Sequence, residues 1–191
     1  MRRVRVVALL ALVCVASATD RKERLDLKHL LTSYPALREV VITHITPTEK
    51  QAMFVYGTGK LVLQPLMMNG IRASGPVPAC IAFANPDEVK AIVKMMIDRH
   101  FLDLPVRSYV VMEAALQDDP LKDLQLHTIR VATDEGFAER TFGTGMYGNE
   151  RLNIPPDFAA IEKMLTELRA RNFPAGEKWD CRIAPAVQFR K

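Results

Sequence analysis

Apolar and polar residues alternate in the first half of the chain with a spacing that predicts β-strands. From Val40 onward the period is two, with positions 40, 42 and 44 alternating with 41, 43 and 45, as in a buried strand. Two further strands are expected at residues 52–56 and 60–64, on either side of a Gly-Thr-Gly turn at 57–59. Successive strands joined by short turns indicate an antiparallel meander.

Two later segments have the period of an amphipathic helix. The first begins after Asn85-Pro86-Asp87-Glu88, which supplies an N-cap, a proline at the first helical position and an acid at the third. Its apolar stripe consists of Val89, Ile92, Val93, Met96 and Ile97. The second begins at Pro155-Pro156-Asp157 and ends before Pro174. Its apolar face consists of Phe158, Ile161, Met164, Leu165 and Leu168.

Between these helices, residues 124–131 and 136–142 flank a Thr-Asp-Glu-Gly turn and predict a β-hairpin. Residues 65–84 and 143–149 are rich in proline or glycine and are expected to be loops. The resulting order of strands and helices predicts an α+β fold, with a small antiparallel sheet and two amphipathic helices packed on one of its faces.

The N-terminus has the pattern of an export signal. Arg2, Arg3 and Arg5 precede an apolar run at residues 6–13, and Ala16-Ser17-Ala18 supplies small residues for cleavage after Ala18. Lipid attachment at Cys14 is the alternative, although the preceding Val13 is larger than such signals prefer. The expected location is therefore secreted or periplasmic.

This interpretation divides the chain into four parts and changes the meaning of its charge. They are a signal peptide at 1–18, a charged, partly helical segment at 19–39, an α+β domain at 40–174 and a tail at 175–191. Cleavage removes three of the 26 basic residues and none of the 22 acidic ones, so the formal charge of +4 falls by three units. A nearly neutral chain without a basic stripe argues against a nucleic-acid partner. No later apolar run is long enough to form a transmembrane segment.

Two cysteines remain after cleavage, Cys80 and Cys181. An even pair in an exported protein predicts a disulfide, because the compartment is oxidising. Two buried free thiols are the alternative.

Candidate motifs for cofactors and metals lack the context that their chemistry needs. Residues 143–148 match G-x-G-x-x-G, but they follow a β-hairpin and precede no helix, so no dinucleotide cofactor is expected. The four histidines have no two-ligand spacing, and no metal is expected. However, His44 and His127 lie in predicted strands that could be neighbours in one sheet. A small hydrolase or ligand-binding protein with a site near these two residues is therefore one hypothesis for function.

The leading hypothesis is a non-enzymatic domain that binds another protein, although enzymatic activity is left open. Apolar side chains in the two expected loops are its candidate contacts, because methionine adapts well to partner surfaces. These residues are Met67, Met68, Ile71, Met146 and Tyr147. A structural component of the cell envelope is a third hypothesis.

The pattern resembles small exported bacterial domains of unknown function and the emfourin-type domains that inhibit secreted metalloproteases. Three pieces carry this resemblance: the glycine turn at 56–60, the helix end at 100–104, and the hairpin at 124–142 that leads to the last helix. The chain differs by its longer middle loop, its cysteine pair and its tail, and no functional residue can be transferred. The resemblance implies an exported binding domain, with a protease as an expected partner, by analogy of fold.

Overall fold

A computed structural model describes residues 27–32, 39–46, 51–65, 76–106, 124–133, 136–147, 150–175 and 181–185. The predicted signal peptide at 1–18 lies outside these residues.

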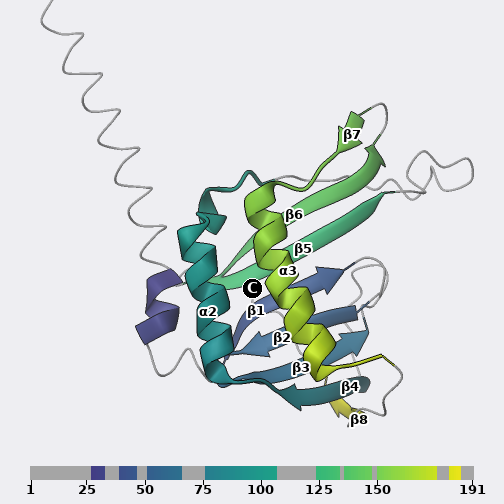
Figure 1. The fold of residues 1–191 in the computed structure, drawn as a ribbon. Helices are drawn as coiled ribbons and strands as arrows, with labels where there is room; N and C mark the ends of the chain where they lie inside the picture. Colours follow the sequence, from purple (N-terminus) through teal and green to yellow (C-terminus); the bar gives the residue numbers. More distant parts are fainter. Residues whose placement is uncertain are drawn as a thin grey trace, which may run out of the picture.

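The described strands form one antiparallel sheet in the order β7-β6-β5-β1-β2-β3-β4-β8 (Figure 1). The strands are β1 (Val40–Thr46), β2 (Gln51–Tyr56), β3 (Lys60–Pro65), β4 (Pro76–Phe83), β5 (Gln125–Thr133), β6 (Gly136–Tyr147), β7 (Glu150–Leu152) and β8 (Cys181–Pro185). The predicted α+β class and antiparallel sheet are confirmed. At eight strands the sheet is larger than expected.

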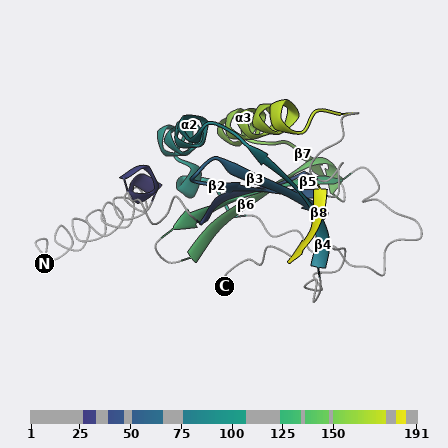
Figure 2. The ribbon, with the colours of Figure 1, turned by 90° about the horizontal axis from the view of Figure 1, so that it is seen from below.

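Two long helices, α2 (Pro86–Asp98) and α3 (Pro156–Asn172), lie side by side over the sheet (Figure 2). A helical segment at 27–32 and a short 3-10 helix, η2 (Phe101–Asp103), accompany them. The predicted capping box of α2 is present: the Asn85 side chain accepts from the Asp87 backbone N–H at 3.0 Å, and Glu88 accepts from that of Asn85 at 3.3 Å.

The main core lies between this helical layer and the sheet. Buried side chains of α2, α3, β1, β2, β3, β5 and β6 belong to one apolar cluster. At its centre the rings of Phe142 and Phe158 meet edge to face, with centroids 4.8 Å apart. Ion pairs from Arg99 to Asp157 and from Arg171 to Glu88 join the two helices at the surface.

The expectation of a loop throughout residues 65–84 is wrong, because residues 76–83 form β4. The two prolines that suggested a loop, Pro76 and Pro78, lie in the half of β4 that pairs with β8. Pairing with β3 involves only residues 80–83. The ladder to β3 therefore needs no N–H group from either proline, and the strand tolerates both.

The expectation of a glycine-rich loop at 143–149 is also wrong, because β6 continues through Tyr147 and pairs with β7. Gly143 lies opposite Leu126 within the sheet. A Cβ atom at Gly143 would lie 2.7 Å from Leu152 Cδ1, closer than van der Waals contact permits. The absence of a side chain at Gly143 therefore leaves space for the side chain of Leu152.

The predicted disulfide between Cys80 and Cys181 is present. The two residues face each other on β4 and β8, so the bond fastens an edge strand to the sheet. Residues 181–185 of the expected tail thus belong to the fold.

We predict that Phe158→Ala lowers the free energy of unfolding by about 3–5 kcal/mol, because it removes a fully buried ring from the helix–sheet interface. Denaturant unfolding measures the change. The matched control is Phe83→Ala, which should cost less than about 0.5 kcal/mol because Phe83 is 74% exposed. Equal losses in the two variants would contradict the assignment of the core.

Replacing both Cys80 and Cys181 by serine is expected to release β8 first, since β8 is an edge strand that pairs with β4. Hydrogen exchange should be accelerated more in β8 than in β1. The expected loss of global stability is about 2–5 kcal/mol. Unchanged protection of β8 in the variant and in the reduced wild type would contradict this role.

Candidate functional site

Two histidines from neighbouring strands face the helical layer. On β1, His44 lies opposite Ile129 of β5. Side chains two positions apart on a strand point to the same face, so His127 shares the face of Ile129 and therefore of His44. The two strands that hold these histidines are thus neighbours in the sheet, and the histidines are close together.

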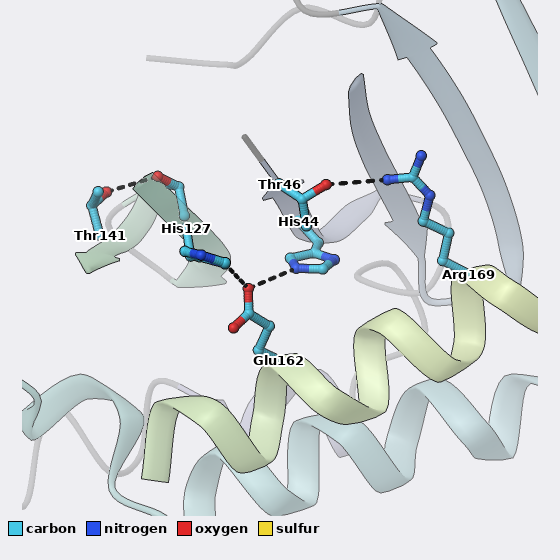
Figure 3. A network of polar contacts seen from close by, with 7 residues as sticks. His44, Thr46, His127, Thr141, Glu162 and Arg169 are labelled. Atoms are coloured by element: carbon cyan, nitrogen blue, oxygen red, sulfur yellow. Dashed lines mark hydrogen bonds and ion pairs between the residues drawn. The ribbon is translucent and has the colours of Figure 1, made fainter. Parts of the chain in front are cut away.

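A carboxylate from α3 reaches this pair from above. Glu162 follows the buried Ile161 and precedes Leu165 by three positions, so it lies on the flank of the apolar stripe of the helix. From this flank its side chain extends toward the sheet and ends between the two imidazole rings (Figure 3).

Both imidazoles contact the same carboxylate oxygen. His127 Nδ1 lies 2.6 Å from Glu162 Oε1, which is a short, strong hydrogen bond. His44 Nε2 lies 3.5 Å from that oxygen, within ion-pair distance when the ring is protonated but without a hydrogen bond to it. Three elements therefore meet at one oxygen atom.

The cluster is largely shielded from solvent, and this determines its charge. The side chains of His44, His127 and Glu162 are 0%, 18% and 13% exposed. Burial alone raises the pKa of Glu162, but its close contacts with His127 and His44 and the positive charge that these rings carry when protonated outweigh burial and lower that pKa from 4.5 to about 2. Glu162 is therefore an anion at neutral pH, and the proton of the short contact resides on His127 Nδ1.

The cluster lines a pocket of about 410 Å³ beside α3. The lining residues are His44, Thr46, His127, Ala159, Glu162, Lys163, Thr166, Glu167 and Arg169. Lys163 and Glu167 are both well exposed and lie 3.9 Å apart. The buried Arg169 donates to Gln51 Oε1 at 2.6 Å and to Thr46 Oγ1 at 3.4 Å. Glu162 and Arg169 thus lie seven residues, or about 10 Å along the helix axis, apart on one wall of the pocket.

Three imidazole nitrogens of the cluster are buried without a hydrogen-bond partner among the described residues. They are both ring nitrogens of His44 and Nε2 of His127. Buried polar atoms in proteins are nearly always hydrogen-bonded, so each unpartnered atom requires an explanation. Both rings line the pocket.

The remaining candidate residues do not join this cluster. His29 lies in the helical segment 27–32. His100 lies between α2 and η2, with its Nδ1 3.4 Å from Asp103 Oδ2. In the part of the chain that the structure describes, no group of three or more His, Cys, Asp or Glu side chains is arranged to hold a metal ion.

The residues proposed for protein binding are only partly described. Met67, Met68 and Ile71 lie outside the described residues. Met146 lies on β6 and is 40% exposed, while Tyr147 ends that strand and its side chain is not described. Binding of a partner protein through these residues therefore stays a prediction. Residues 143–147 belong to strand β6 and do not form the expected loop.

Sequence reasoning named both histidines but missed Glu162. The available signal was its position: a carboxylate on a flank of an otherwise apolar helical stripe, four residues after Phe158. Many surface carboxylates share such a position, so this signal becomes specific only when the helix is placed over the histidines.

Comparisons with protein-family models, with characterised proteins and with solved structures find no match to this chain. The resemblance to emfourin-type domains therefore stays a prediction. Among the described helices, none has both the length and the apolar character that crossing a membrane requires.

We predict that Glu162→Gln destabilises the protein at neutral pH and that this difference disappears in acid. The folded-state pKa of Glu162, about 2, is below its ordinary value of 4.5, so its charge stabilises the fold above pH 4.5 and this contribution is lost as the pH falls toward 2. The difference should be at most about 3 kcal/mol at pH 7.

Denaturant unfolding of the wild type and the variant between pH 7 and pH 2 measures this difference. Glu167→Gln is the control on the same helix, because Glu167 is 53% exposed and its loss should change stability little. A difference in the free energy of unfolding between wild type and Glu162→Gln that stays constant down to pH 2 would show that the carboxylate charge does not stabilise the cluster.

Proposed function

We propose that this protein binds a small polar molecule in the pocket between α3 and strands β1 and β5. The observation that carries the proposal is the cluster at the pocket wall, where one carboxylate oxygen contacts two imidazoles whose other nitrogens are buried without a partner. This combination is typical of a site that a ligand completes.

Several physical features support binding over a purely structural role. A volume of about 410 Å³ falls in the range of small-molecule sites. The polar groups converge from three elements, and Glu162 has a strongly shifted pKa, as residues in functional sites often do. A purely structural network would be expected to satisfy all its buried atoms, because unpaired ones reduce stability.

Each residue has a distinct role in this proposal. Glu162 is a fixed negative charge that accepts hydrogen bonds. By accepting from His127 Nδ1, it also orients that ring and leaves Nε2 with a free lone pair. His44 supports the carboxylate from the other side, and Arg169 holds Thr46 at the far end of the pocket.

The same dyad could serve acid–base chemistry, since a carboxylate that holds a histidine in one tautomer is a recurrent device in catalysis. The described lining contains no serine or cysteine that could act as a nucleophile. Reversible binding is therefore the function that the geometry favours, and hydrolysis would require an attacking water.

The proposal places this binding domain outside the cytoplasm. The N-terminal signal pattern and the Cys80–Cys181 bond support that location, because disulfides persist in oxidising compartments. In this proposal α2 and α3 act as one amphipathic layer on one sheet face, and the pocket opens beside the flank of α3.

We predict that small polar fragments bind next to His127 and His44. A fragment screen observed by NMR on the full chain, with labelled histidine rings, should give hits that shift these two residues and leave His100, at the end of α2, unchanged. Glu162→Gln should weaken the hits about 10-fold or more, because it removes a charge-assisted hydrogen bond.

Glu167→Gln serves as the matched variant and should leave the affinities within about 2-fold. Hits that shift His100 instead, or that bind both variants as well as the wild type, would contradict a site at Glu162.

A further inference from the structure

We infer that the pocket selects a small organic cation whose charged group donates hydrogen bonds, such as a primary ammonium. This inference rests on the proposed function and adds the chemical class of the ligand. It follows from which atoms of the cluster carry protons and from the sign of the charge that they leave at the pocket wall.

The proton of the short contact is directed at Glu162. A neutral imidazole has one donor nitrogen and one acceptor nitrogen. His127 uses its donor, Nδ1–H, on the carboxylate at 2.6 Å, so its Nε2 is an acceptor. His44 Nε2 lies 3.5 Å from the same oxygen without a hydrogen bond, so the neutral ring of His44 offers one acceptor, whichever nitrogen carries the proton.

Each neutral ring therefore offers one unpartnered acceptor nitrogen. Figure 3 shows the two rings on either side of the Glu162 carboxylate, each with one nitrogen toward it. Together with the carboxylate they make this end of the pocket rich in lone pairs. A ligand that satisfies them must bring several N–H or O–H donors.

The charge of this end selects cations among such donors. Glu162 is an anion, and the contacts that the described structure gives it are to the two imidazoles. With neutral rings this charge has no cationic contact partner in the cluster. Because the site is largely buried, an ammonium beside it is attracted more strongly than it would be in water.

The two nearby cations do not reverse this sign. Lys163 is 77% exposed and pairs with Glu167. Arg169 lies about two helical turns from Glu162, and its guanidinium donates to Gln51 and Thr46. An anionic ligand at Glu162 would instead meet a carboxylate of like charge and lone pairs on both rings.

A metal ion fits this arrangement less well than an ammonium. The two nitrogens of one imidazole point in diverging directions, so lone pairs opposite Glu162 cannot converge with its carboxylate on one compact ion. An ammonium on a larger body can reach these acceptors through separate N–H groups. The described residues also contain no cluster arranged for metal binding.

Acid should weaken the binding of such a cation. The titratable and charged groups that face the pocket are His44 from β1, His127 from β5, and Glu162, Lys163, Glu167 and Arg169 from α3. Protonation of either histidine converts its acceptor nitrogen into a donor. It also places a positive charge beside Glu162 that balances the charge of the carboxylate. The ammonium then loses a partner and meets a like charge.

The test uses three probes of nearly equal shape on the full wild-type chain: benzylamine, benzyl alcohol and benzoate. Calorimetry at pH 7.5, with NMR of the labelled histidine rings, should show benzylamine binding at His127 at least about 10-fold more tightly than benzoate. Its affinity should be lower at pH 5 than at pH 7.5. Glu162→Gln should remove the preference, whereas Glu167→Gln should retain it.

The comparison of head groups needs no variant, so it remains decisive if Glu162→Gln fails to fold. Benzoate binding more tightly than benzylamine at His127 would overturn the ligand class while supporting the pocket itself. Stoichiometric Zn²⁺ binding that shifts both histidine rings would overturn it in favour of a metal. If no probe or fragment shifts His127, the proposed function itself fails.

Discussion

The pairing of β1 with β5 is the interaction on which the rest of this structure depends. It joins the meander β1–β4 to the hairpin β5–β6, two units that are separated in the chain by α2. Without this pairing the sheet would be two smaller sheets, and neither would present a face wide enough for both helices. The same pairing also places His44 and His127 on one face, so the core and the site have a common origin.

The site combines two requirements that oppose each other. The flank of α3 must pack against the sheet, which favours apolar side chains, yet it carries Glu162 into a largely buried position. Burial of a carboxylate is unfavourable, and its close contacts with His127 and His44 more than offset it, as the low pKa indicates. A cluster of this kind makes a pocket with a defined charge, because its atoms are held by three elements and cannot relax independently.

Sequence patterns predicted most of the elements and failed where composition was misleading. The strands from residue 40, the capping box at Asn85 and the last helix were all predicted, because alternation and caps are local properties. Strand β4 was missed because its prolines suggested a loop, although they lie where pairing with β3 has already ended. The strand at Gly143 was missed because its glycines suggested a turn, whereas Gly143 makes room for Leu152.

By itself the sequence determined the local elements, the signal pattern and the pair of cysteines available for a disulfide, since each depends on residues or counts that can be read along the chain. It also named His44 and His127 as candidates. Only the tertiary structure decided that they meet at Glu162 Oε1, because the hydrogen bond from His127 spans 35 residues and depends on where α3 crosses the sheet. The position at which α3 crosses the sheet is set by the packing of apolar faces. Spacing along the chain carries no information about it, because many sequences have such faces.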